Sequence, residues 1–228
     1  MKLHILLLLL FSFYTLTTTQ SSWTPVVRGQ FPYLTTVVNE NGFFNAILIV
    51  NQHTVLTTAT FVTKRNSNNN SFRRLPGQVC VDENRLCMDF QRNDVKLLTY
   101  NNTEQLNENN IAIIALPFAF IERPQVKSIF PYELWVTHTP GTPLQILSLQ
   151  DKKYFYADAE ISKIVQNRPN VKIIVYNNTD QPSIGSLVIF KRTFENYLLG
   201  LYINEYSFGY ANVYDLYYYR DFILENSQ

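Results

Sequence analysis

The run Thr54-Val55-Leu56-Thr57-Thr58 has the length of one β-strand, and all of its residues except Leu56 are β-branched. Such side chains favour extended backbone and pack well on a pleated sheet, so the run predicts a strand. Runs of similar length and composition recur about every ten residues, which is typical of an all-β chain. They lie at residues 34–38, 46–50, 95–100, 111–116, 144–149, 171–176, 187–190, 197–203 and 211–214.

Clusters of Asn, Gly, Pro and Asp stand between these runs and favour turns. One segment near the C-terminus departs from the strand pattern, because Leu216, Tyr219, Phe222 and Ile223 recur at the spacing of one helical face. We therefore predict a C-terminal α-helix after the strands. No linker rich in Pro, Gly or Ser divides the chain, so residues 24–228 are predicted to form one domain.

The composition is that of a folded protein with little net charge. The chain has 228 residues, of which 46% are hydrophobic and 16% charged, and its formal net charge is +1. That balance gives no electrostatic reason to expect nucleic acid or a membrane as a partner. Only 7 residues are Gly, which counts against a phosphate-cradling loop, and we expect neither a cofactor nor a metal.

The first residues are predicted to be an export signal. Met1-Lys2 supplies a positive charge, and residues 5–11 are an apolar run too short to cross a bilayer of about 30 Å as a helix. We predict a signal peptide over residues 1–20, so that the mature protein is secreted and extracellular. The alternative is a segment that is retained as a signal anchor.

Export gives meaning to two further features. Cys80 and Cys87 are the only cysteines, and outside the cell we expect them to form a local disulfide; two free thiols are the alternative. A bridge closing so small a loop contributes about 2.5 kcal/mol in the chain-entropy model. Asn69, Asn101 and Asn177 each begin an Asn-x-Ser/Thr sequon, so we predict glycosylation at these three residues.

A series of segments keeps a recognisable order along the chain. They read Gly29-Gln30-Phe31-Pro32-Tyr33, Val55-Leu56-Thr57-Thr58-Ala59-Thr60-Phe61, Asn110-Ile111-Ala112-Ile113, Gln181-Pro182-Ser183-Ile184-Gly185-Ser186-Leu187-Val188, Leu198-Leu199-Gly200-Leu201 and Ala211-Asn212-Val213-Tyr214. In order and spacing they resemble the motifs of trypsin-like (chymotrypsin-family) serine proteases, over about residues 26–226. The resemblance implies two packed six-stranded antiparallel β-barrels and a C-terminal α-helix. An unrelated β-sandwich of similar size is the alternative.

The same resemblance places substitutions at the catalytic positions. The family uses a serine nucleophile, a histidine base and a buried aspartate that orients the histidine. Thr60 stands at the histidine position and cannot accept a proton near neutral pH, while Asn110 stands at the aspartate position. Ser183 matches the nucleophile, but a serine hydroxyl is weakly nucleophilic without a base. The triad at Thr60, Asn110 and Ser183 is therefore degenerate, which implies a pseudoenzyme.

Residues around these positions differ from the family pattern as well. Gln181 and Pro182 replace a glycine and an aspartate, and proline restricts the preceding residue to extended backbone, so we expect no formed oxyanion hole. The family's cysteine pair beside the histidine corresponds to Asn45 and Phe61, so this bridge is lost as a whole. Asn177 falls at the expected base of the specificity pocket, where a glycan would block a cleft.

A scaffold without catalysis acts through its surface. We predict a secreted, inactive protease homologue that binds an extracellular protein, such as a protease or its substrate, and that is a monomer. The resemblance implies a role as cofactor, decoy or regulator in a protease cascade or in an immune or reproductive process. The loop between Cys80 and Cys87 and the many tyrosines after residue 200 are candidate contact surfaces. The alternatives are a residual serine hydrolase that uses Ser183 and a small-ligand carrier with an interior pocket.

Overall fold

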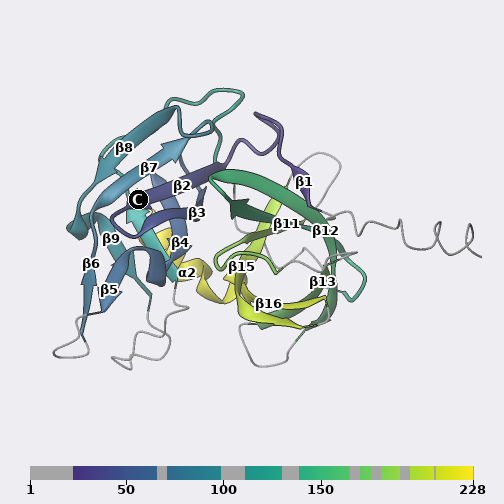
Figure 1. Cartoon of the computed structure of the whole chain (residues 1–228). Helices are drawn as coiled ribbons and strands as arrows, with labels where there is room; N and C mark the ends of the chain where they lie inside the picture. Colours follow the sequence, from purple (N-terminus) through teal and green to yellow (C-terminus); the bar gives the residue numbers. More distant parts are fainter. Residues whose placement is uncertain are drawn as a thin grey trace, which may run out of the picture.

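The computed structural model describes residues 23–65, 71–98, 111–129, 139–164, 170–175, 181–190, 196–207 and 209–227. The predicted signal peptide over residues 1–20 lies outside this part of the chain. The described strands form two seven-stranded antiparallel sheets and a separate two-stranded ribbon. Figure 1 shows the two sheets side by side; apart from β1, which joins the second sheet, the N-terminal half of the chain forms one and the C-terminal half the other.

The first sheet has the strand order β8-β7-β2-β3-β4-β10-β9. Its two edge strands, β8 and β9, are joined in the chain only by Gln91 and the 3-10 turn η2 (Arg92–Asp94). Because this connection is so short, the sheet must curl until its two edges lie near each other. The bounds are β2 (Leu34–Asn39), β3 (Gly42–Leu48), β4 (Thr54–Thr58), β7 (Gly77–Val81), β8 (Leu86–Phe90), β9 (Val95–Leu97) and β10 (Ile111–Ala115).

The second sheet closes into a barrel. Its order is β1-β12-β11-β14-β15-β16-β13, and a further pairing of β12 with β13 joins the ends of a six-stranded cylinder, to which β1 adds at the side. The bounds are β1 (Thr24–Pro25), β11 (Pro143–Gln150), β12 (Lys153–Ile164), β13 (Asn170–Val175), β14 (Leu187–Phe190), β15 (Tyr197–Ser207) and β16 (Tyr210–Asp215). The predicted all-β architecture of two packed barrels is confirmed, the first of them as a curled sheet.

Three clusters of buried apolar side chains hold these sheets. One fills the C-terminal barrel and another fills the concave side of the first sheet. The third lies between the two and takes side chains from both, for example Ile47 and Ile113 from the first sheet and Leu147 and Leu201 from the second. Because both sheets contribute side chains to this middle cluster, separating the sheets would expose apolar surface on each of them.

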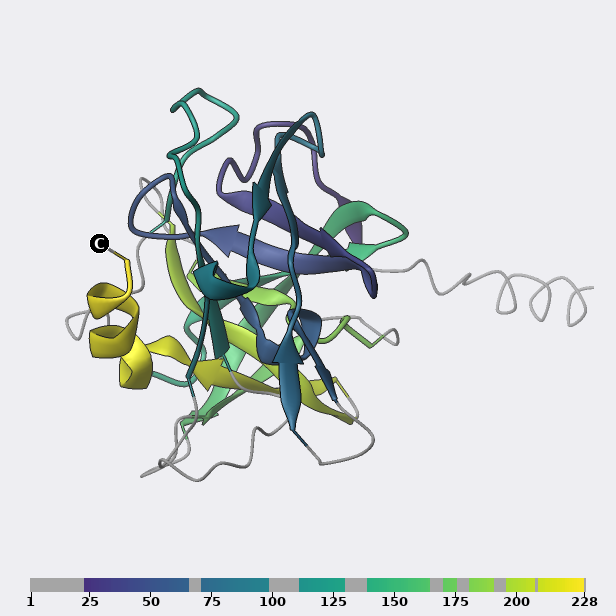
Figure 2. The ribbon, with the colours of Figure 1, turned by 90° about the vertical axis from the view of Figure 1, so that its left-hand side faces the viewer.

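The chain ends in a short helical segment that packs on the middle cluster. The 3-10 turn η4 (Leu216–Tyr219) starts where the Asp215 carboxylate accepts the Tyr217 N–H at 3.0 Å, and α2 (Arg220–Glu225) follows it. Of the predicted helical face, Leu216, Tyr219 and Ile223 are buried and Phe222 is half-buried, although residues 216–219 form a 3-10 turn and only residues 220–225 an α-helix. Figure 2 shows this segment on the outside of the molecule, with the C-terminus turned toward the first sheet.

The terminal segment is also tied to the first sheet by hydrogen bonds. The Asn51 side-chain amide, in the turn after β3, donates to the carbonyl oxygen of Ser227. Within the described residues, no helix has both the length and the apolar character that a bilayer span requires.

Candidate functional site

Thr60 lies in η1 (Ala59–Phe61), one turn of 3-10 helix that follows β4. Its neighbours Ala59 and Phe61 are buried, whereas Thr60 is exposed, so its side chain faces solvent at the position where the family carries its base. A threonine hydroxyl does not titrate near neutral pH. Asn110, at the aspartate position, lies outside the described residues.

Ser183 lies in the segment 181–186 that leads into β14. A tight turn forms here, because the Ser186 N–H donates to the Ser183 carbonyl at 3.0 Å and the Gly185 N–H donates to the Tyr202 backbone carbonyl at 2.9 Å. Gly185 has a φ of +75°, in the left-handed region that glycine tolerates best. A Cβ atom at this residue would lie 2.6 Å from the Phe61 ring, so the turn is also closed by contact with η1.

The side chain of Ser183 is half-buried, and its hydroxyl is bonded to three buried polar residues. Its Oγ accepts the Asn45 side-chain amide at 2.8 Å and lies 2.8 Å from Ser148 Oγ and 3.3 Å from Ser186 Oγ. Asn45, Ser148 and Ser186 are 2% exposed or less. Since Asn45 lies on the first sheet and Ser148 on the second, the hydroxyl of the half-buried Ser183 is hydrogen-bonded at the junction of the two sheets.

The hydrogens can be assigned so that each of the three serine hydroxyls donates one hydrogen bond. Ser186 Oγ donates to the Ser183 carbonyl at 2.6 Å, so it can only accept from Ser183 Oγ, and Ser148 Oγ then donates to Ser183 Oγ. The acceptor of the Ser183 proton is thus another serine hydroxyl. A serine hydroxyl is far too weak a base to activate a nucleophile at neutral pH.

The backbone amide of Ser183 is occupied as well. Its N–H donates to Ser148 Oγ at 3.0 Å. In the trypsin-like template the N–H of the nucleophilic serine is one of the donors that stabilise the oxyanion. In this chain that donor already has a buried partner, so it is not presented to a substrate carbonyl.

The hydrogen-bonding role of Asn45 was not predicted from the sequence. The resemblance marks it only as a lost cysteine, but the structure gives its side chain two further bonds, from Nδ2 to the Ile184 carbonyl at 3.1 Å and from the Leu149 N–H to Oδ1 at 2.8 Å. The amide therefore links β3 of the first sheet to β11 and to the Ser183 turn of the second. The available signal was a polar residue inside an apolar run, since Asn45 stands between Phe44 and Ala46.

Phe61 fills the other lost cysteine position. Its ring stacks on Phe44, with centroids 4.4 Å apart and planes 15° apart, and it presses on Gly185. The lost cysteine pair is thus replaced by an amide network at Asn45 and by ring packing at Phe61. Asn45 and Phe61 therefore both keep the first sheet and η1 in contact with the Ser183 turn.

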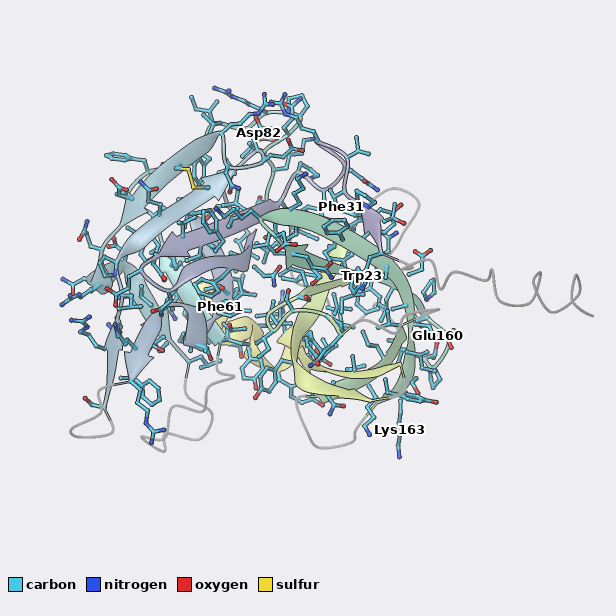
Figure 3. The ribbon with its side chains drawn as sticks, in the orientation of Figure 1. Trp23, Phe31, Phe61, Asp82, Glu160 and Lys163 are labelled. Atoms are coloured by element: carbon cyan, nitrogen blue, oxygen red, sulfur yellow. A yellow bond between two sulfur atoms is a disulfide. The ribbon has the colours of Figure 1, made fainter. Side chains whose placement is uncertain are left out.

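Cys80 and Cys87 form the predicted disulfide. They lie directly opposite each other on β7 and β8, so the loop contains only residues 82–85, and its tip is left-handed at Asp82, Glu83 and Asn84. The predicted stapled loop is therefore the turn of a short hairpin, which Figure 3 shows at one end of the first sheet.

The hairpin tip is pinned to the N-terminal segment by an ion pair. Arg28 donates from Nε and Nη2 to the two Asp82 carboxylate oxygens at 2.7 and 2.6 Å. This hydrogen bond holds the pKa of Asp82 below its usual range. A cleft of about 340 Å³ lies beside the pair; Phe31, Leu34, Lys152 and Tyr154 are among its lining residues. Neither Thr60 nor Ser183 lines it.

The N-terminal segment is held by packing and strand pairing. Trp23 is buried in the core of the second barrel, Thr24 and Pro25 pair with Tyr156 and Phe155 of β12, and the Val26 N–H donates to the Tyr154 carbonyl at 3.0 Å. The segment that precedes Val26 is thus part of the sheet.

Several predicted residues lie outside the described part of the chain. These are the sequons at Asn69, Asn101 and Asn177, together with Asn110. The residues that the structure describes include no group of three side chains placed to hold a metal ion. The small-ligand alternative required an interior pocket; the described cleft lies beside the surface hairpin, and the two sheets enclose packed apolar clusters.

Solved structures share this architecture. Kallikrein-related peptidase 10 matches with a TM-score of 0.63 at 16% identity, over 88% of this chain and 98% of that chain. Human heparin-binding protein matches with a TM-score of 0.66 at 15% identity, over 90% of this chain and 95% of that chain. An atomic-resolution structure of the same protein gives a TM-score of 0.67 at 15% identity, over the same shares of the two chains.

The sequence alone has no such match. No protein-family model matches it, and no curated protein does so either. The family resemblance therefore rests on the order of the segments and on the architecture, which agree over most of the chain. This chain has the two-barrel fold of the trypsin-like serine proteases.

Proposed function

We propose that the protein is a secreted, catalytically inactive homologue of trypsin-like proteases that acts by binding an extracellular protein. The observation that carries the proposal is the hydrogen bonding of Ser183, whose hydroxyl is bonded to the buried residues Asn45, Ser148 and Ser186 and whose N–H donates to Ser148 Oγ. Hydrolysis by this fold needs a free nucleophile, a base and an open oxyanion site.

The base position supports the same proposal. Thr60 faces solvent and carries no group that accepts a proton near neutral pH. To recover catalysis, a histidine at this residue would also require Ser183 to leave its cluster and its N–H to part from Ser148. A single substitution at Thr60 is therefore expected to leave the protein inactive.

The surface offers a place for a partner. The hairpin tip at residues 82–85 and the Arg28–Asp82 pair lie beside a cleft whose lining also includes the apolar residues Phe31 and Leu34. The disulfide and the two-point ion pair hold the hairpin tip before binding, which lowers the entropy lost on association. The predicted export and the predicted glycosylation favour a partner outside the cell.

The decisive test is active-site labelling. The mature protein is treated with a fluorophosphonate probe beside an active trypsin-like protease, with Ser183→Ala as the matched variant. We expect no Ser183-dependent labelling and no ester or amide hydrolysis by either form. Stoichiometric labelling that Ser183→Ala abolishes would overturn the proposal and support the residual hydrolase instead.

A binding test addresses the second half of the proposal. Binding of extracellular proteins to the immobilised mature chain is compared between the wild type, Ser183→Ala and a variant in which residues 82–85 are replaced by Gly and Ser. We expect Ser183→Ala to bind as the wild type does and the hairpin variant to bind more weakly. The reverse order would remove the hairpin from the interface.

A further inference from the structure

The disulfide between Cys80 and Cys87 is open to solvent on one side. Cys80 lies on β7, inside the first sheet, and is 3% exposed, whereas Cys87 lies on the edge strand β8 and is exposed. Figure 3 shows the bond between the two strands of the hairpin. Exposed disulfides are the ones that exchange readily with other thiols. A thiolate that arrives from solvent therefore reaches the sulfur of Cys87 first, and Cys80 is the leaving group.

The bond supports a part of the hairpin that has few other supports. Phe90 is the one buried residue of β8. In the hairpin tip, the three residues from Asp82 to Asn84 have φ values between 50° and 66°, a left-handed backbone that L residues adopt at a cost in energy. The tip keeps this unfavourable backbone because the disulfide closes its base and the Arg28–Asp82 pair holds one of its residues.

Strand β7 does not depend on the bond in the same way. It pairs with β2 through four residue pairs, and its residues Val79 and Val81 are buried in the cluster on the concave side of the first sheet. Opening the disulfide should therefore loosen the tip and β8 while the two sheets keep their structure. The protein is then folded in both redox states, as a switch requires.

The bond also borders the cleft beside the hairpin. Cys80 lines this cleft, and so do Arg28 and the tip residues Asp82, Glu83 and Asn84. The Asp82 side chain is only 8% exposed in this arrangement, with both of its carboxylate oxygens on Arg28. A tip that relaxes to an ordinary backbone would carry Asp82 away from Arg28 and change one wall of the cleft.

We propose that the Cys80–Cys87 disulfide is a redox switch that an extracellular protein dithiol opens, which releases the hairpin tip. One thiolate of the dithiol attacks Cys87 Sγ, the bond between the cysteines breaks, and Cys80 leaves as a thiolate that takes up a proton. The second thiolate of the dithiol then attacks the dithiol's own sulfur in the mixed disulfide and releases Cys87, which takes up a proton as well. The dithiol becomes a disulfide, and the electrons that it gives up reduce the cystine. Because the two thiols are only 7 residues apart in the chain, the reverse reaction closes the bond again.

The consequence for binding rests on the proposed function, which places a partner at the hairpin tip and its cleft. The oxidised form presents an ordered tip, so it loses less entropy on association than the reduced form and binds the partner more tightly. The switch itself is measured without a partner. Failure of the experiments below is therefore distinguishable from failure of the proposed function.

The first test measures thiol exchange in the folded protein. The mature protein is incubated in native buffer with reduced thioredoxin as the dithiol, or with a thioredoxin whose second active-site cysteine is replaced by serine, which traps the mixed disulfide. We expect complete reduction without denaturant, and we expect peptide mass spectrometry to find the trapped thioredoxin on Cys87 and not on Cys80. Reduction that occurs only in urea, or trapping on Cys80, would overturn the proposal.

The second test compares amide hydrogen exchange of the oxidised and the thioredoxin-reduced wild type. We expect exchange at residues 82–85 to become about tenfold faster on reduction, whereas β3 and β14 stay protected as in a folded protein. The matched control is the double variant Cys80→Ser, Cys87→Ser, whose tip should exchange as that of the reduced wild type does and should not respond to thioredoxin. Equal exchange of the tip in both redox forms of the wild type, or loss of protection throughout the reduced protein, would show that the bond is not a switch.

Discussion

At the scale of single residues, Asn45 contributes most to the candidate site. Its amide accepts the Leu149 N–H at 2.8 Å and donates to Ser183 Oγ at 2.8 Å, and it is 2% exposed. Asn45→Ala leaves these buried partners without bonds, each at a cost of about 1–3 kcal/mol. We expect a loss of at least about 2 kcal/mol in the free energy of unfolding, measured by urea denaturation. The control Asn41→Ala, in the exposed β2–β3 turn, should change it by less than about 0.5 kcal/mol; equal effects would contradict the role of Asn45.

Gly185 supplies a second prediction at this scale. Ala at this residue must adopt a φ of +75° and place its Cβ 2.6 Å from the Phe61 ring. Gly141 is the natural control, because its φ is +86° but no atom lies within 4 Å of its Cβ position. Gly141→Ala should lower stability by about 1 kcal/mol, the cost of the left-handed backbone alone. We expect Gly185→Ala to lower the melting temperature clearly further, and equal shifts would show that the Phe61 contact is unimportant.

At the scale of elements, the hairpin β7–β8 combines a cross-strand disulfide with a left-handed tip. The double variant Cys80→Ser, Cys87→Ser removes a loop constraint worth about 2.5 kcal/mol in the chain-entropy model. We expect a loss of that order in stability and faster amide exchange at residues 79–88. In β3 and β4, by contrast, the exchange rate should change only as far as the lower global stability requires. Unchanged exchange in the hairpin would mean that the Arg28–Asp82 pair and strand pairing alone hold it.

The elements also show which features a sequence reveals. The predicted runs match β4 and β14 at their observed bounds, since every residue of these strands is buried and apolar or β-branched. Strand β12 gives no such run because its inward residues include the small Ala157 and Ala159, which alternate with polar Asp158 and Glu160. Cys80 and Cys87 were expected in a loop, whereas they lie on paired strands.

Only part of the candidate site could be predicted from the sequence, because some of its contacts join residues far apart in the chain. The order of the segments locates Thr60 and Ser183, because these positions depend on short local motifs. The bonds of Asn45 to Ser183 and Leu149 join residues 138 and 104 positions apart, and no local pattern encodes such a contact.

At the scale of the whole molecule, two tyrosine hydroxyls join the barrels. Tyr154 of β12 donates to the Thr35 carbonyl of β2, and Tyr33, before β2, accepts the Asn196 amide from the other half at 3.1 Å. Burial raises the pKa of both phenols above their usual value. The middle apolar cluster is shared by the same two halves. We therefore expect one cooperative unfolding transition, in which both barrels lose structure together.

These tyrosines predict how the molecule responds to alkaline pH. Because their pKa is higher in the folded state than in the unfolded state, their contribution is fully present below about pH 10 and is lost as the pH rises toward the folded value. Each should lower stability by up to about 1.4 kcal/mol per pH unit above pH 10. Tyr154→Phe should lower stability near neutral pH by about 1 kcal/mol and flatten the alkaline decline, as measured by urea midpoints from pH 8 to about pH 11. Tyr218→Phe, an exposed control in η4, should leave the decline unchanged. If Tyr154→Phe declined as steeply as the wild type, the inter-barrel phenol would not be the group that responds to pH.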